Sequence, residues 1–303
     1  MRNGFPGMAA PHRVGGVHVQ EGAVMFKLDR ELVEPVMVAA FEGWNDAGEA
    51  ASLAVEHLSD MWGAQELCAL APDDYYDFQV TRPRMSVVEG RLGEVEWPTT
   101  RVRVVRPSNA RHDVVLVSGP EPNLRWRSYT ADLLAIAREL GVRRIVLLGS
   151  LLADAPHTRP VPVSGMASPP ELGARHGLDP STYSGPTGIV GVVHERFDAA
   201  GIETVSLWAA IPHYVAHPPC PKATLALLSR VQDFVGAEVP FGDLPEESVS
   251  WESDVDSLTA EDEDIAAYVR GLEEAKDTVD LPEASGDAIA REFERYLRRE
   301  DET

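Results

Sequence analysis

Short apolar runs rich in β-branched residues alternate with helical patterns along most of this chain, and no other feature constrains the fold as strongly. The clearest runs are Val36 to Phe41, Val114 to Ser118, Ile145 to Leu148 and Val205 to Ile211. Runs of this length between turn residues are typical of buried strands. Helical patterns occupy Asn45 to Trp62, Arg127 to Leu140 and Pro221 to Val235. The alternation predicts an α/β domain in three layers, with helices on both faces of a sheet.

Two regions predict local pairing. The first helical pattern lies between Val36 to Phe41 and a further strand, Glu66 to Leu70, and this order predicts a parallel pair joined by a right-handed crossover. Residues 75–106 instead contain strand-like pieces separated by Gly and Pro, which predict an antiparallel insertion or a sheet edge. Its arginines include Arg82, Arg84, Arg101, Arg103 and Arg106. We interpret them as a solvated edge, with an anion site as the alternative.

Charge and composition divide the chain and limit its partners. Residues 1–22 are predicted to be a flexible lead-in, 23–240 the α/β domain, and 241–303 an acidic linker (Glu246 to Asp256) with a small helical appendage (Thr259 to Lys276 and Pro282 to Arg299). This last region holds 21 acidic and 6 basic residues, and the whole chain has a net charge of −22. Because phosphate contacts require clustered Lys and Arg, we predict no nucleic-acid partner.

The sequence predicts a cytoplasmic protein without a membrane partner. No apolar run approaches the roughly 20 residues that a spanning helix needs. The N-terminal residues lack the apolar stretch of a secretion signal. Cys68 and Cys220 are too few for a disulfide framework, so we expect both to be buried apolar side chains in a reducing compartment.

Polar and ionisable residues gather where the predicted core strands end. The stretch from Ile145 to Pro162 begins as a strand and continues as a loop, because Pro156, Pro160 and Pro162 remove backbone donors. Ligands of open α/β sheets bind beyond the carboxyl ends of strands. The predicted ligand-binding residues are Asn45, Asp46, Glu121, Asp154, His157, Thr158, Arg159, Tyr183, Thr187 and His213.

Within this set, Asp46, Asp154 and His157 are the candidate acid and base groups, since His and carboxylate side chains transfer protons near neutral pH. Arg159 is the candidate anion holder. A His/carboxylate metal set is a further possibility, and it would combine His213 and His217 with Asp46, Asp154 and His157. Prolines around the two histidines remove helical i, i+4 geometry, so we predict no metal, and no cofactor motif is present. No nucleophile elbow occurs either.

Five motifs resemble the bacterial branch of the PAC2 family, which is named after a proteasome assembly chaperone. They are GWNDAGEAA (43–51), GPEP (119–122), ADAPHTRPV (153–161), YSGPTGI (183–189) and PHYVAHPPCPKA (212–223), in that order. The resemblance implies a phosphorylase/hydrolase-like three-layer fold, a variable helical C-terminal region and self-association, with a trimer as one possible state. Eukaryotic relatives dock through a tail ending hydrophobic-Tyr-any residue, whereas this sequence ends Asp301-Glu302-Thr303.

Two classes of function stay open at this point. The leading hypothesis is a non-enzymatic, self-associating assembly or interaction factor linked to proteasome biology, with a protein partner. The alternative is a small-molecule enzyme, hydrolase-like or phosphorylase-like, or a metabolite-binding sensor that uses the pocket at the strand ends. These hypotheses differ in one structural expectation. An enzyme or sensor requires the polar side chains to converge around an open pocket, and an interaction factor does not.

Overall fold

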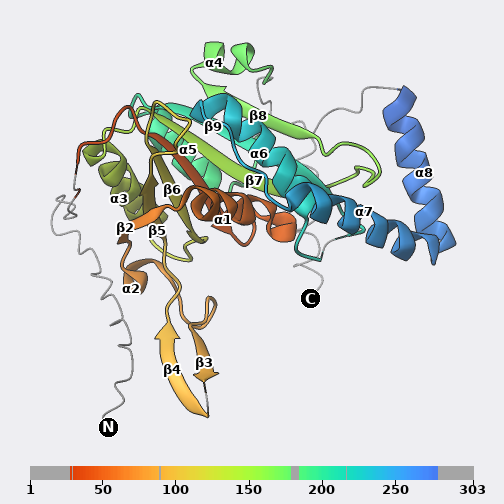
Figure 1. The fold of residues 1–303 in the computed structure, drawn as a ribbon, viewed down its shortest axis with the longest axis horizontal. Coiled ribbons are helices and arrows are strands. Elements are labelled where there is room, and N and C mark those ends of the chain that lie inside the picture. Colours follow the sequence, from red (N-terminus) through yellow and green to blue (C-terminus); the bar gives the residue numbers. More distant parts are fainter. Residues whose placement is uncertain (1–27, 29, 89, 179–183, 216, 279–303) are drawn as a thin grey trace, which may run out of the picture.

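The computed structural model describes residues 28, 30–88, 90–178, 184–215 and 217–278. Its centre is a seven-stranded sheet in the order β2-β5-β6-β1-β7-β9-β8 (Figure 1). The strands are β1 (Val36–Glu42), β2 (Gln65–Ala69), β5 (Arg101–Val105), β6 (Val114–Pro120), β7 (Arg144–Ala153), β8 (Val163–Ser168) and β9 (Glu203–Pro212). The four central strands, β6, β1, β7 and β9, pair in parallel, and their carboxyl ends meet at one edge.

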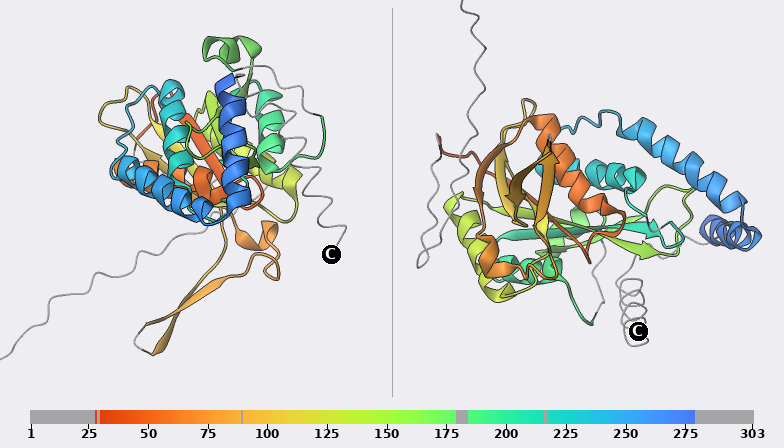
Figure 2. Two further views of the ribbon diagram at one scale, coloured as in Figure 1. Left: turned by 90° about the vertical axis from the view of Figure 1, so that its right-hand side faces the viewer. Right: turned by 90° about the horizontal axis from the view of Figure 1, so that it is seen from below.

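Helices cover both faces of this sheet (Figure 2), which confirms the predicted three-layer fold. A 3-10 turn, η1 (Ala47–Glu49), leads into α1 (Ala50–Trp62), and α1 and α6 (Pro221–Val235) pack on one face. The other face holds α3 (Trp126–Glu139) and α5 (Ile189–Asp198). Successive side chains of a strand point to opposite faces. Accordingly, Val38 of β1 joins the core under α1, whereas Ala39 joins the core under α3.

The predicted parallel pairing of the first two strands is wrong. β2 hydrogen-bonds to β5 alone, in antiparallel register, and lies at the edge of the sheet. The neighbours of β1 are β6 and β7. The physical reason lies in polarity: β2 begins with exposed Gln65 and Glu66, which suit an edge, while β6 and β7 are apolar enough to be buried on both faces.

The antiparallel insertion is confirmed. After the short α2 (Pro72–Tyr75), the strands β3 (Arg84–Val88) and β4 (Arg91–Glu96) form a separate two-stranded hairpin that projects from the body (Figure 1). The last strand in residues 75–106 is β5, which belongs to the main sheet. Edge strand β8 was not predicted, because its sequence VSGMAS lacks a β-branched run. It is followed by a short helix, α4 (Pro170–Arg175).

The predicted linker from Glu246 to Asp256 is wrong, since these residues lie within α7 (Leu244–Ala260). Its buried positions are Leu244, Ser248, Val255 and Thr259, at helical spacing, with partly buried Trp251 packed on the same core. Two polar residues on the buried face weaken the apolar pattern, which explains the error. The next helix, α8 (Glu263–Thr278), confirms the first predicted appendage helix; Pro282 to Arg299 lies outside the described residues.

Three further expectations concern the chain as a whole. No helix in the described ranges is both long enough and apolar enough to cross a membrane. Cys68 and Cys220 are buried and unpaired, as expected. Burial raises the pKa of the Cys68 thiol to about 12 and that of Cys220 to about 11. The predicted boundaries at residues 22 and 240 stay predictions.

Candidate functional site

His157 lies in the loop that follows β7, residues 154–160, which we call the β7 loop. Its Nδ1 is 2.8 Å from the hydroxyl of Tyr214, which follows β9, and its Nε2 is 3.0 Å from Oδ1 of Asp256 on α7. The backbone N–H of His157 donates to the same tyrosine hydroxyl over 2.9 Å. The side chain is only 1% exposed, so neither nitrogen faces a substrate.

The next two residues of the β7 loop bind α8. Thr158 donates its hydroxyl to Glu273. Arg159 binds both carboxylate oxygens of Asp277, at 3.1 and 2.7 Å, and contacts Glu273 at 3.2 Å. The hydrogen bonds from the Arg159 guanidinium hold the pKa of Asp277 below its usual range. The anion that Arg159 holds is therefore a side chain of this same protein.

Asp154 and His213 form a third contact with α8. The hydroxyl of Tyr268 donates to Asp154 Oδ1 over 3.0 Å, and His213 Nδ1 lies 3.3 Å from the same oxygen. The rings of His213 and Tyr268 pack edge to face, with centroids 5.3 Å apart. Lys222 of α6 completes the junction, because its ammonium contacts Glu252 of α7 and the carbonyl of His157.

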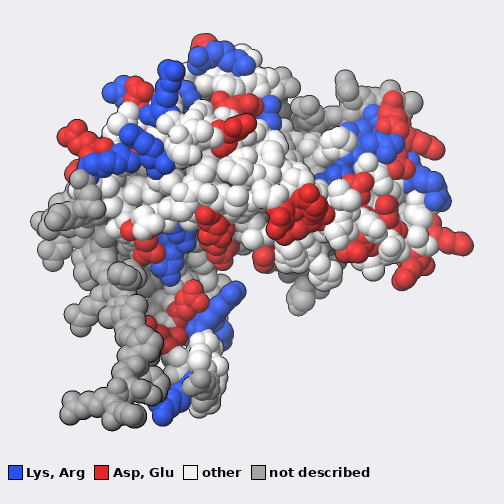
Figure 3. All heavy atoms as spheres, in the orientation of Figure 1, with Lys and Arg blue, Asp and Glu red and all other residues white. Residues whose placement is uncertain are grey.

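The carboxyl ends of β7 and β9 are thus a docking surface for α7 and α8. Five predicted ligand-binding residues take part: Asp154, His157, Thr158, Arg159 and His213. Figure 3 shows acidic side chains interspersed with basic ones at the end of the molecule that carries α8. Polar atoms of Asp154, Thr158 and Arg159 contact α8, and His157 contacts α7. The His213 ring packs against Tyr268 of α8.

Asp46 and Asn45 stabilise the start of α1 and its neighbours. Asp46 Oδ1 accepts the backbone N–H groups of Ala51 and Ser52, at 2.8 and 3.2 Å, and burial raises the pKa of this carboxyl. The Asn45 amide donates to Glu121 over 2.8 Å. Both side chains are buried. These contacts describe helix capping and loop packing, which is the ordinary role of such residues at a helix N-terminus.

Glu121 connects three elements. Its Oε1 accepts the Asn45 amide and also the backbone N–H of Ile189, the first residue of α5, at 2.8 Å. Thr187 lies beside this junction and donates to the carbonyl of Gly188 over 3.3 Å. Tyr183 lies outside the described residues. Within the described ranges, no three His, Cys, Asp or Glu side chains form a group able to hold a metal, so the His/carboxylate set is not assembled.

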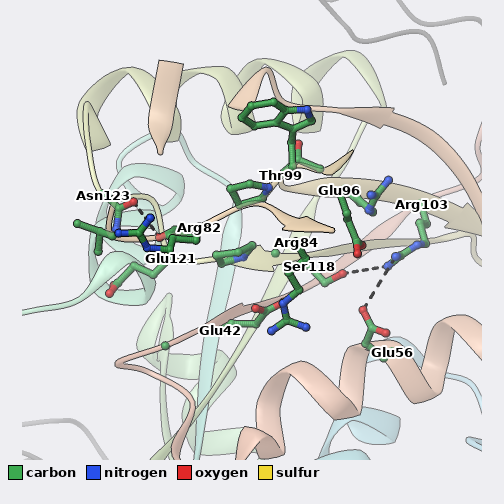
Figure 4. Close-up of a pocket in the computed structure, with 18 residues that line it drawn as sticks. Glu42, Glu56, Arg82, Arg84, Glu96, Thr99, Arg103, Ser118, Glu121 and Asn123 are labelled. Carbon is green, nitrogen blue, oxygen red and sulfur yellow. Dashed lines mark hydrogen bonds and ion pairs between the residues drawn. The ribbon is translucent and has the colours of Figure 1, made fainter. Parts of the chain in front are cut away.

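A cavity of about 680 Å³ opens elsewhere along the same sheet edge, at the base of the β3–β4 hairpin (Figure 4). We call it the hairpin cavity. Its walls come from the ends of β1 and β6, from β4 and β5, and from the segment before β3. Four arginines line it: Arg82, Arg84, Arg101 and Arg103. Four glutamates also line it: Glu42, Glu56, Glu96 and Glu121.

The charges in the hairpin cavity are unevenly paired. Arg101 binds Glu66 at 3.0 Å, and Arg103 donates to Ser118 over 2.9 Å with Glu56 at 4.0 Å. The side chains of Arg82 and Arg84 form no hydrogen bond or ion pair with the described part of the chain. Burial, with the neighbouring charge of Asp46, raises the pKa of Glu42.

Of the predicted site residues that the structure describes, Glu121 alone lines the hairpin cavity. The interpretation of the arginines as a solvated edge missed this cavity. A signal was available, because residues two apart on a strand share a face, and Arg101 and Arg103 have that spacing. Arg106 lies outside the cavity and pairs with buried Asp113 at 2.9 Å.

This chain is similar to known proteins in sequence and in fold. The sequence model of the PAC2 family matches residues 40–259, which cover the sheet and most of α7. The chain belongs to the PAC2 family. It is 53% identical to a PAC2 family protein from Streptomyces avermitilis, over 78% of this chain and 99% of the other, with a TM-score of 0.73. No curated protein matches it.

Two further solved structures carry names that bear on function. A proteasome-assembly chaperone homologue from Mycobacterium tuberculosis is 50% identical, covering 77% of this PAC2 protein and 99% of that chain, with a TM-score of 0.73. An archaeal proteasome activator from Pyrococcus furiosus is 17% identical, covering 77% and 97%, with a TM-score of 0.62. At that identity the second comparison shows a shared fold.

Proposed function

We propose that this PAC2 protein is a non-enzymatic, self-associating assembly factor that acts on the proteasome. The observation that carries the proposal is its 50% identity to a chain described as a proteasome-assembly chaperone homologue. The site geometry supports it. The candidate proton-transfer residues Asp46, Asp154 and His157 bind helices of the same chain, and His157 has no exposed ring nitrogen.

The β3–β4 hairpin supports self-association. Its cross-strand pairs Met85–Val95 and Val87–Leu92 are apolar, and all four side chains are more than 40% exposed. A lone two-stranded hairpin is marginally stable in water, and an exposed apolar patch commonly marks an interface. The occupant we propose is a second copy of this chain, since two identical hairpins offer each other matching apolar faces and free strand edges.

Light scattering during size-exclusion chromatography tests the self-association. Leu92→Lys introduces a charge on the hairpin, and Val249→Lys places the same charge on α7, where Val249 is similarly exposed. We expect the wild type and Val249→Lys to elute as the same oligomer and Leu92→Lys to elute as a smaller species. If all three have one mass, the hairpin is not the interface.

The proteasome role requires purified components. Proteasome α and β subunits of the source organism are mixed with and without the full chain, and the formation of core particles is followed by native mass spectrometry. We expect a complex of the chain with α or β subunits and a higher rate of particle formation. A rate and species distribution unchanged at a molar excess of chain would contradict the proposal. That result would reject the proteasome role even if the chain forms an oligomer.

A further inference from the structure

We propose that the hairpin cavity binds a small anionic molecule, whose carboxylate or phosphate group is held by Arg82 and Arg84. This inference does not depend on the proteasome role. It starts from the two guanidinium groups that line the cavity without a hydrogen bond or ion pair to the described part of the chain. Arginine presents several N–H donors in a planar fork that matches carboxylate and phosphate oxygens.

The acidic side chains in the cavity do not neutralise these two arginines. Glu121 already accepts from the Asn45 amide and the Ile189 N–H, and Glu56 lies beside Arg103. Burial raises the pKa of Glu42, and the neighbouring charge of Arg84 opposes that shift. Arg82 and Arg84 therefore keep N–H donors for an oxyanion in a cavity that Glu42 and Glu96 also line.

The remaining wall defines the rest of the ligand. Glu42 and Glu96 face the same space and accept hydrogen bonds, so they suit hydroxyl or amino groups on the ligand (Figure 4). Trp97 adds an apolar surface that is 47% exposed, and its ring packs against Phe78 with centroids 4.7 Å apart. The volume of about 680 Å³ lies within the range of small-molecule sites. The ligand class is a polar metabolite that bears an acidic group.

The size and position of the cavity argue against a larger ligand. The whole chain has a net charge of −22, which disfavours binding of a nucleic-acid backbone. The cavity lies between the hairpin base and the ends of β1 and β6, and it does not extend onto the α7–α8 docking surface. It is therefore separate from that docking surface, and it shares only Glu121 with the predicted site residues that the structure describes.

Isothermal titration calorimetry of the full chain tests the inference with two probes, inorganic pyrophosphate and citrate. The test variant is Arg82→Gln/Arg84→Gln. The matched control is Arg111→Gln/Arg127→Gln, which removes the same charge from exposed positions outside the cavity and outside the hairpin. Unfolding temperatures of both variants are measured beside the wild type, and we expect them to agree because all four arginines lie on the surface.

We expect saturable binding of at least one probe, weakened at least about tenfold by the test variant and unchanged in the control. Binding of pyrophosphate alone identifies a phosphate ligand, and binding of citrate alone identifies a carboxylate ligand. Arg82→Lys/Arg84→Lys keeps the charge and is expected to bind more tightly than the Gln variant. The inference is overturned if neither probe binds saturably, or if the Gln variant binds as well as the control.

Discussion

The imidazole Nε2 of His157 lies 3.0 Å from the carboxylate of Asp256, a residue 99 positions later in the chain. The histidine belongs to the β7 loop and is buried, whereas the aspartate belongs to α7 and is 58% exposed. A His–Asp contact of this length is also what an acid–base site uses. Here Tyr214 is the third partner. Both ring nitrogens of His157 lie within hydrogen-bond distance of a side chain of the same protein, Nδ1 of Tyr214 and Nε2 of Asp256. The contact therefore joins the C-terminal helices to the sheet.

Removal of the imidazole tests that conclusion. His157→Ala loses the hydrogen bonds to Tyr214 and Asp256 and leaves a small cavity, so we expect the free energy of unfolding to fall by about 2 kcal/mol. Urea denaturation measures this change, and hydrogen exchange shows whether the amides of α7 lose protection. His217→Ala is the control, since His217 is exposed and its change is expected to stay within about 0.5 kcal/mol. Equal effects at both positions would contradict the docking role.

Arg159 provides a second test, confined to α8. Arg159→Gln removes the paired contact with Asp277 and the contact with Glu273. We expect faster amide exchange in α8 and unchanged exchange in the central strands. Because these ion pairs are partly exposed, 1 M salt is expected to produce the same change in the wild type. Arg175→Gln serves as control, as Arg175 contacts only the Glu171 carbonyl of its own helix among described residues.

Much of the fold was predictable because burial sets the sequence pattern. β1, β6, β7 and β9 are buried on both faces and read as apolar runs, and α6 (Pro221–Val235) begins and ends where Pro221 and Gly236 predict. Pairing was less predictable. β1 pairs with β6 and β7, which lie far from it in the sequence, so β2 pairs with β5 at the edge of the sheet. The sequence near β1 and β2 does not specify these distant pairings.

The candidate site shows a different limit. The sequence grouped Asp154, His157, Arg159 and His213 at one strand edge. In the structure Asp154 contacts His213, and His157 and His213 both pack against Tyr214. The sequence did not indicate their partners, because Asp256, Glu273 and Asp277 lie in a region whose acidity suggested a solvated linker and appendage. The hairpin cavity is a similar case. Its wall combines separate segments that meet only when β5 pairs with β6.

Asp46 predicts a dependence of stability on pH. Burial raises its pKa in the folded state, while Ser52 and Ala51 donate to the carboxylate and Glu49 adds negative charge nearby. A raised folded pKa means that the protonated carboxyl is favoured by folding. The resulting stability is complete below the unfolded pKa of about 4 and is lost as the pH rises through the folded pKa.

Asp46→Asn removes this titration and keeps an oxygen for the Ala51 and Ser52 donors. We expect the free energy of unfolding of the variant, minus that of the wild type, to increase from about pH 4 to pH 7. Urea denaturation at several pH values measures the difference. The control is Asp60→Asn at the exposed end of α1, for which we expect a constant difference. A pH-independent difference for Asp46→Asn would show that burial does not raise the pKa of the Asp46 carboxyl.

Two glycines predict opposite responses to the same substitution. A Cβ on Gly188 would lie 2.3 Å from Oδ1 of Asn45, whose amide is held by Glu121, so the side chain has little freedom to move. We expect Gly188→Ala to lower the free energy of unfolding by roughly 1–3 kcal/mol through overpacking. Gly271 lies inside α8, and a Cβ added there would meet no described atom within 4 Å, so Gly271→Ala is expected to stabilise α8 by about 1 kcal/mol. Urea denaturation reports the first effect and amide exchange in α8 the second. If Gly188→Ala is tolerated, Asn45 and the start of α5 are less tightly packed than the Asn45–Glu121 contact implies.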